Sequence, residues 1–128
     1  LKPEKYMNLS GEVIRDFVKF YKIPVENILI INDDMDLMIG SFRLKYKGSP
    51  SGHNGLKNIE LHLGTSEYKR LKIGISHNRL MDTKNYVLSK FSVDEMKLIN
   101  PIIDIVPNII EDFINIPFDN VMNKYNHK

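Results

Sequence analysis

Three carboxylates follow the end of a short apolar run in this sequence. Residues 28–31 are Ile-Leu-Ile-Ile, which is typical of a buried strand, and Asp33, Asp34 and Asp36 come directly after them. In open α/β sheets, ligands and catalytic groups gather beyond the carboxyl ends of strands. A carboxylate at such a point can bind a metal ion or orient a histidine base. A solvated acidic turn is the alternative that the spacing leaves open.

A second candidate is the loop of residues 48–55, which reads Gly-Ser-Pro-Ser-Gly-His-Asn-Gly. His53 and Asn54 stand at its end, where a predicted helix begins, and the free N–H groups of a helix start can bind an anion or a carbonyl oxygen. On spacing alone, His53 is the candidate general base, with Asp33 or Asp36 orienting it. An ordinary loop with an asparagine cap is the alternative.

Basic residues decorate two predicted strands. Arg43, Lys45 and Lys47 alternate in the first of them and therefore share one face. The basic residues of the second strand are Lys69, Arg70 and Lys72. Such faces could bind phosphates, and a solvated face is the alternative. The net charge of +2 is too small to indicate a nucleic-acid partner by itself.

Several kinds of site are excluded by composition. The sequence contains no cysteine, which excludes disulfides, thiolate metal sites and a cysteine nucleophile, and fits a reducing cytosol. No two of its four histidines have the spacing of metal ligands on a helix. The longest apolar runs are too short to span a membrane.

The predicted elements alternate between helices and strands. Apolar spacing predicts helices over residues 11–21 and 54–63, the second closed by Gly64, and strands over residues 28–33, 42–47 and 71–75. Ser92 and Glu95 match a capping box that opens a long helical stretch, in which Pro101 and Pro107 are expected to produce a kink or a split. A short helix is predicted after residue 117. This order indicates one α/β domain over residues 1–128 with an antiparallel element in a mixed sheet.

Four stretches of the chain, in the same order and at matching separations, resemble bacterial-type peptidyl-tRNA hydrolases. They are Tyr-Met-Asn-Leu-Ser-Gly at residues 6–11, Asp-Asp-Met-Asp-Leu at 33–37, Gly-His-Asn-Gly-Leu-Lys at 52–57 and Arg-Leu-Lys-Ile-Gly-Ile at 70–75. The resemblance implies a three-layer α/β/α fold with a central mixed sheet. It also implies that the first strand of that fold precedes this chain, so that the domain is incomplete at its N-terminus.

The resemblance changes the roles of the candidate residues. It implies that Asp33 orients a catalytic histidine that lies upstream of Leu1, so His53 becomes a neighbour of the site. Residues 1–128 alone are therefore expected to be inactive. Asn8 and Asn54 are implied to hold the substrate near the scissile ester. The other implied contacts with the substrate or its tRNA are made by Tyr6, Met7 and His53, with Lys45 and Lys72 on the phosphates.

The implied activity is hydrolysis of the ester that joins a peptide, or an N-blocked amino acid, to tRNA, which returns the tRNA to translation. The enzyme is expected to be cytoplasmic, monomeric when complete and independent of a cofactor. A non-catalytic RNA-binding relative is the alternative, and the retention of Asp33, Asn8 and Asn54 argues against it. An unrelated nucleotide-binding domain is disfavoured because the sequence lacks a Gly-x-Gly-x-x-Gly motif.

Overall fold

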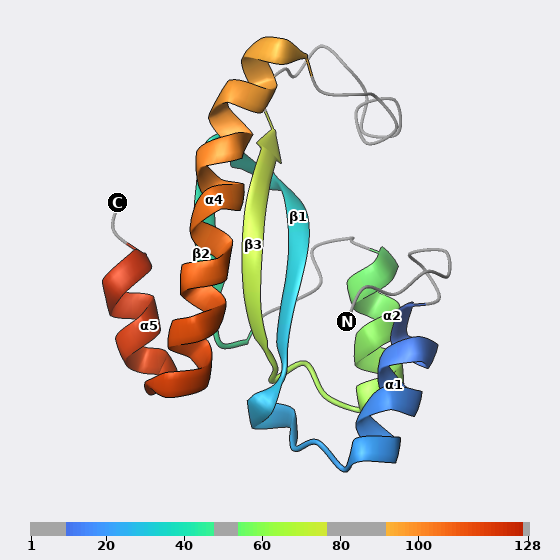
Figure 1. Cartoon of the computed structure of the whole chain (residues 1–128). Helices are drawn as coiled ribbons and strands as arrows, with labels where there is room; N and C mark the ends of the chain where they lie inside the picture. Colours follow the sequence, from blue (N-terminus) through green and yellow to red (C-terminus); the bar gives the residue numbers. More distant parts are fainter. Residues whose placement is uncertain (1–9, 48–53, 77–91, 127–128) are drawn as a thin grey trace. The chain divides into compact units, whose positions relative to one another are not determined.

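A computed structural model describes residues 10–47, 54–76 and 92–126 of the chain. The chain forms two compact units, which are residues 1–30 with 45–70 (the first unit) and residues 31–44 with 71–128 (the second unit). Helices and strands alternate along the chain, as the sequence predicts (Figure 1). The α/β class is therefore confirmed.

The first unit is built on two helices, α1 (Ser10–Tyr21) and α2 (Asn54–Leu63). Both match the predicted ranges, and Gly64, at φ 76°, ends α2 in the left-handed conformation that glycine adopts readily. A single 3-10 turn, η2 (Val25–Asn27), leads from α1 toward the sheet. The core of this unit contains Ile14, Ile28, Ile30, Leu56, Ile59 and Tyr68.

Helices α1 and α2 approach each other most closely at Gly11. A Cβ atom on this residue would lie 2.2 Å from the backbone oxygen of Asn58, so only glycine fits. The Gly11 N–H donates to Asn58 Oδ1 at 2.6 Å, which gives a partner to one of the free donors at the start of α1. This contact ties the entry of α1 to the middle of α2.

The described sheet has three strands in the order β1 (Leu29–Met38), β3 (Lys69–Ser76) and β2 (Phe42–Lys45). Strands β1 and β3 run in the same direction and β2 runs against them, so the sheet is mixed, as expected (Figure 1). Gly74 allows β3 to lie close to the end of β1, because a Cβ there would be 2.1 Å from the Met38 carbonyl oxygen. Among the described residues, β1 pairs on one side only.

Strand β1 is longer than the sequence indicates. The prediction ended it at residue 33 and placed the acidic cluster beyond its end, but the strand continues to Met38 and carries Asp33, Asp34 and Asp36 within it. The backbone remains alongside β3 to the end, where the Ile39 N–H donates to the Ser76 carbonyl at 2.8 Å. Pairing with a neighbouring strand thus overrides the low strand propensity of aspartate.

Helix α4 (Val93–Asn115) begins at the predicted capping box. The Glu95 N–H donates to Ser92 Oγ at 3.1 Å, and the Ser92 N–H donates to Glu95 Oε1 at 2.6 Å. The helix is not split at Pro101 or Pro107. Both prolines are exposed, so water can bind the carbonyl groups that lose their helical donor. Helix α5 (Phe118–Tyr125) follows Pro117 as predicted.

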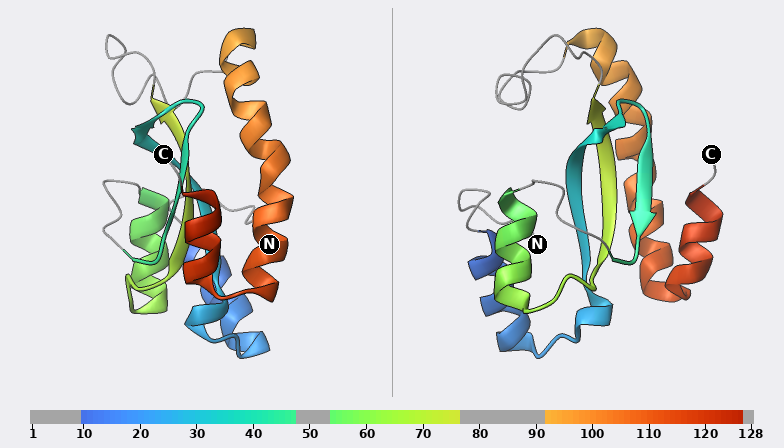
Figure 2. Two further views of the ribbon diagram at one scale, coloured as in Figure 1. Left: turned by 90° about the vertical axis from the view of Figure 1, so that its left-hand side faces the viewer. Right: turned by 180° about the vertical axis from the view of Figure 1, so that it is seen from behind.

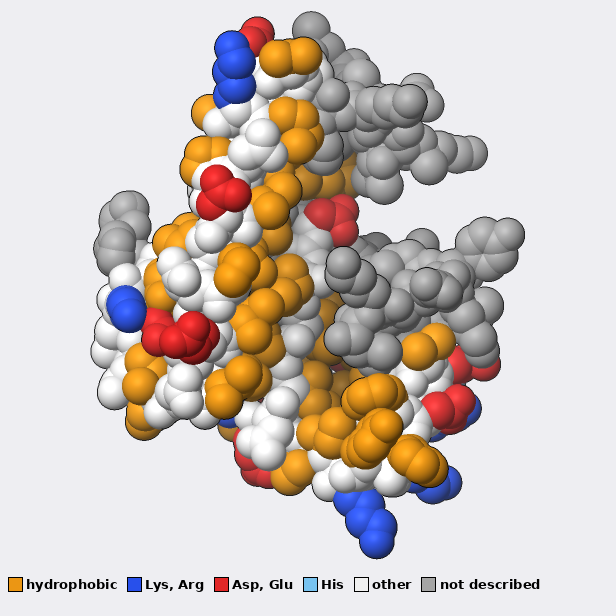
Figure 3. Space-filling view, viewed as in Figure 1, with side chains coloured by type: hydrophobic (Ala, Val, Ile, Leu, Met, Phe, Trp, Pro, Cys, Tyr) orange, Lys and Arg blue, Asp and Glu red, His pale blue; other side chains and the backbone are white. Residues whose placement is uncertain are grey.

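Helix α4 runs along one face of the sheet in the second unit (Figure 2). Its outer side carries many apolar side chains (Figure 3). The large apolar residues of α4 that are exposed are Val93, Leu98, Ile103, Ile110 and Ile114. None of the described helices is both long enough and apolar enough to cross a membrane.

Candidate functional site

Buried polar groups gather where β1 and β3 lie side by side in the second unit. Lys72 Nζ on β3 lies 3.3 Å from Asp34 Oδ2 on β1, and the two side chains are only 7% and 10% exposed. Asn32, two residues before Asp34, is 6% exposed. A buried charge is tolerated only when it is paired, so this ion pair explains how β1 and β3 accommodate both groups.

Asp33 lies between Asn32 and Asp34 and is partly buried. Successive side chains of a strand point to opposite faces, so Asp33 projects from the face opposite to its two neighbours. Its backbone carbonyl accepts a hydrogen bond from Asn32 Nδ2 at 2.8 Å. The Asn32 side chain thus holds the backbone of Asp33 from the face opposite to the Asp33 carboxylate. A carboxylate can accept a hydrogen bond from a donor such as an imidazole N–H.

The predicted site residues are only partly within the described chain. Asp33, Lys45 and Lys72 lie in strands, and Asn54 is the first residue of α2. The site residues outside the described part of the chain are Tyr6, Met7, Asn8 and His53, together with the side chain of Asn54. Their roles remain predictions.

The basic residues of the two strands have different surroundings. On β2, Arg43 and Lys45 are exposed on either side of Leu44, which is 1% exposed, so the predicted basic face is confirmed for these two residues. Lys47 lies beyond the end of the strand, which the prediction extended to residue 47. On β3, Arg70 and Lys72 are 0% and 5% exposed, so the interpretation of this run as a solvated face is wrong for both. The reason is that β3 is the central strand of the described sheet, which leaves little room for water around its side chains.

A cluster that the sequence analysis missed surrounds Arg70 in the first unit. The Arg70 guanidinium lies 4.1 Å from the ring centroid of Tyr68, 3.8 Å from Glu60 Oε2, and donates to the Ser66 carbonyl at 2.6 Å. Tyr68 Oη donates to Glu60 Oε2 at 2.8 Å. Burial raises the pKa of the Tyr68 phenol well above its usual range, and the hydrogen bond to Glu60 raises it further. Tyr68 and Arg70 stand two positions apart, one on each side of the first residue of β3, and this spacing was the available signal.

A second missed cluster joins α4 to α5. Asp112 Oδ2 accepts hydrogen bonds from Lys124 Nζ at 2.8 Å and from Tyr125 Oη at 2.6 Å. The bond from Lys124 lowers the pKa of Asp112, and the same bond raises the pKa of Lys124. A surface pocket of about 370 Å³ adjoins the cluster and is also lined by Ile105, Asn108 and Glu111. Because the Asp112 carboxylate already has two partners, we interpret the cluster as a link between the helices.

Metal ligands do not gather in the described parts of the chain. Within residues 10–47, 54–76 and 92–126, no group of three or more His, Asp or Glu side chains is arranged to hold a metal ion. On β1, Asp33 follows Asn32 and precedes Asp34, whose carboxylate is paired with Lys72 of β3. A carboxylate such as that of Asp33 can orient and charge-stabilise a neighbouring base.

Comparison with known proteins gives consistent matches along the chain. The sequence pattern of the family described as peptidyl-tRNA hydrolase matches residues 1–128. The peptidyl-tRNA hydrolase of Listeria monocytogenes is 44% identical over 128 residues, which are 100% of this chain and 69% of the relative. That of Clostridium acetobutylicum is 46% identical over 98% of this chain and 67% of the relative.

Solved structures agree with the sequence matches. The crystal structure of peptidyl-tRNA hydrolase from Acinetobacter baumannii superposes with a TM-score of 0.88 at 35% identity. The superposition covers 97% of this chain and 63% of the other, so the chain spans slightly less than two thirds of that structure.

Proposed function

Because the chain belongs to the peptidyl-tRNA hydrolase family, we propose that the protein hydrolyses the ester bond between a peptide, or an N-blocked amino acid, and the 3′ end of tRNA. The observation that carries the proposal is the match to the family pattern over residues 1–128, together with the 44% identity to the Listeria monocytogenes enzyme. The placement of Asp33 in a strand that is anchored by Asn32 supports it, because a catalytic carboxylate must be held rigidly.

The proposed reaction begins with Asp33. Its carboxylate accepts the N–H of a histidine ring, which the resemblance places upstream of residue 6, and so selects the tautomer whose other nitrogen can take a proton. That nitrogen removes a proton from water, and the resulting hydroxide attacks the ester carbonyl. The carboxylate then stabilises the imidazolium cation. Collapse of the tetrahedral intermediate releases the tRNA hydroxyl, which takes the proton back.

Two asparagines are proposed to hold the substrate. Asn8 precedes α1 in the sequence and Asn54 begins α2. The hydrogen bond between the Gly11 N–H and Asn58 Oδ1 joins these two helices. An amide N–H of either residue can stabilise the oxyanion that forms on the carbonyl. The matched experiment is substitution of each asparagine by alanine, which should lower the rate of hydrolysis.

The partner is proposed to be the tRNA body, which the exposed lysine Lys45 would contact through a phosphate. We further propose that the protein is a cytoplasmic monomer. Translation supplies its substrate in the cytoplasm, and a tRNA-sized ligand needs an accessible surface on a single copy. Sedimentation of the full-length protein with and without tRNA tests the oligomeric state.

The deciding experiment is an assay of the purified full-length protein with N-acetyl-aminoacyl-tRNA. We expect release of the N-acetyl amino acid and of free tRNA, and the same tRNA carrying an amide-linked amino acid should be bound without being cleaved. Binding of both substrates without release from either would identify a non-catalytic RNA-binding relative. Failure to bind tRNA at all would contradict both readings.

A further inference from the structure

The outer edge of strand β2 is covered by the side chain of Asn126, which directly follows the last residue of α5. The Leu44 N–H donates to Asn126 Oδ1 at 2.8 Å, and Asn126 Nδ2 donates to the Leu44 carbonyl at 2.7 Å. An asparagine side chain carries the same donor and acceptor as a peptide group. Asn126 therefore takes the place that a residue of a further strand would have in an antiparallel pair with β2.

The backbone groups of Leu44 point away from the rest of the sheet. On the other side of the same segment, the Gly74 N–H donates to the Ser41 carbonyl at 2.9 Å, so residue 41 faces β3. Because successive residues of an antiparallel strand direct their backbone groups to alternate sides, residues 42 and 44 face the outer edge. In the described sheet β2 is the last strand on this side. Its outer backbone groups are therefore of the kind to which an additional strand can pair.

Helix α5 is fixed to α4, and this attachment holds Asn126 at the edge. Val121 of α5 is 0% exposed, and Tyr125 Oη donates to Asp112 Oδ2 on α4 at 2.6 Å. Figure 2 shows α5 lying next to β2. The side chain of Asn126 thus reaches Leu44 from an anchored backbone, which lowers the conformational entropy that is lost when the pair forms.

Charge gives the same edge a second protection. Arg43 and Lys45 are both exposed and stand on either side of Leu44. If β2 paired with β2 of a second copy about Leu44, Arg43 of one copy would lie opposite Lys45 of the other, and like charges in that arrangement destabilise a strand pair. Salt screens this repulsion between exposed charges. High salt should therefore leave Asn126 as the main obstacle to pairing.

We propose that α5 is a strap that closes the sheet, and that Asn126 occupies the edge of β2 and so prevents this strand from pairing with β2 of a second copy of the chain. Without Asn126, the Leu44 residues of two copies could exchange the two hydrogen bonds across a two-fold axis. The inference concerns association and not hydrolysis, so it stands or falls independently of the proposed function.

The test uses the full-length protein with Asn126→Ala. The matched control is Asn115→Ala, because Asn115 also stands at the end of a helix but donates within that helix, to the Glu111 carbonyl at 3.0 Å. Hydrogen exchange of the Leu44 amide reports whether the edge is covered. Sedimentation equilibrium reports association, at about 0.1 M and about 1 M salt, between which the Debye length falls from roughly 10 Å to about 3 Å.

For Asn126→Ala in low salt, we expect the Leu44 amide to exchange about 5- to 10-fold faster than in the wild type, the factor that corresponds to one ordinary hydrogen bond. In high salt the variant should dimerise, and the Leu44 amide should become protected again as the protein concentration rises. The wild type and Asn115→Ala should show neither change. Wild-type exchange of the β3 amides will show that the sheet of the variant is folded.

Tyr125→Phe provides a milder version of the test if Asn126→Ala does not fold. It removes the hydrogen bond to Asp112 that anchors the strap and leaves Asn126 in place. The Leu44 amide should then exchange faster than in the wild type, by a smaller factor than in Asn126→Ala.

Three results would overturn the inference. Wild-type exchange of the Leu44 amide in Asn126→Ala would show that Asn126 does not cover the edge in solution. Faster exchange with wild-type sedimentation at both salt concentrations would show that the edge is not a pairing surface. Dimerisation without renewed protection of the Leu44 amide would place the contact between copies elsewhere.

Discussion

Strand β3 buries two cations two positions apart, and their surroundings are different. Arg70 is surrounded by groups from a nearby stretch of chain, namely Glu60, the Ser66 carbonyl and the Tyr68 ring. Lys72 is paired with the distant Asp34, beside the proposed catalytic residue. A guanidinium has five donors and a flat face, so it can be satisfied by several groups, whereas an ammonium is a point charge that one carboxylate can neutralise.

The difference separates a cluster within the first unit from an ion pair in the second unit that involves the neighbour of Asp33 in the chain. Changes around Arg70 should alter the free energy of unfolding with little effect on the chemistry of the folded molecules. Changes at Asp33 should alter the rate of hydrolysis more than the stability. Each prediction below tests this division.

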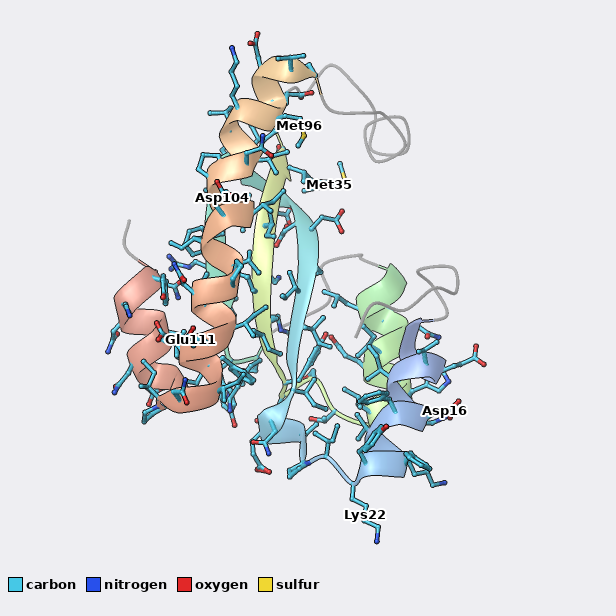
Figure 4. The ribbon with its side chains drawn as sticks, viewed as in Figure 1. Asp16, Lys22, Met35, Met96, Asp104 and Glu111 are labelled. Atoms are coloured by element: carbon cyan, nitrogen blue, oxygen red, sulfur yellow. The ribbon has the colours of Figure 1, made fainter. Side chains whose placement is uncertain are left out.

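The largest effect is expected from Asp33→Asn. The substitution keeps the size of the side chain but removes the charge that selects the histidine tautomer and stabilises its protonated form, so kcat should fall by about 10⁴-fold. Affinity for tRNA should be nearly unchanged, as measured by filter binding at fixed salt. Asp104→Asn on the exposed side of α4 is the control (Figure 4). A kcat within a few-fold of wild type would remove Asp33 from the mechanism.

Arg70→Met should lower the free energy of unfolding by about 3–5 kcal/mol, because it leaves the partly buried Glu60 carboxylate without its cation. Urea denaturation of the full-length protein measures this loss. Arg15→Met, at an exposed ion pair on α1, should cost no more than about 1 kcal/mol. If Arg70→Met instead left the stability intact and abolished hydrolysis, the division between the two cations would be wrong.

A smaller effect concerns pH and Tyr68, whose pKa is raised by burial and by the hydrogen bond to Glu60. The folded state therefore holds this proton more tightly than the unfolded state. The resulting stability is fully present below the unfolded pKa of about 10 and is lost as the pH rises above it. Melting temperatures measured between pH 8 and pH 11 should fall more steeply for the wild type than for Tyr68→Phe. Parallel curves would show that the phenol titrates equally in both states.

The smallest effect in free energy is expected from Lys45→Ala, at an exposed position of β2. Loss of one phosphate contact should reduce the slope of log affinity for tRNA against log salt by about 0.7–0.9. The kcat on a small N-blocked ester without a tRNA body should be unaffected. Lys97→Ala on α4 is the matched surface control. An unchanged slope would assign Lys45 to the solvated surface.

Local signals in the sequence determined the helix limits and the family. Ser92 and Glu95 predicted the start of α4, and Gly64 predicted the end of α2, because caps act within one turn of the chain. The four matching blocks at residues 6–11, 33–37, 52–57 and 70–75 indicated peptidyl-tRNA hydrolase without any structure.

Only the tertiary structure decided the extent of β1, the continuity of α4 and the state of the two cations. Asp33 and Asp34 lie inside a strand because β3 pairs with it, and α4 passes through Pro101 because that side of the helix faces water. Arg70 and Lys72 are buried because their strand is central. The extent of β1 and the pairing of Lys72 with Asp34 depend on neighbours far apart in sequence. The free energy of such contacts exceeds the weak local preferences that a sequence pattern reports.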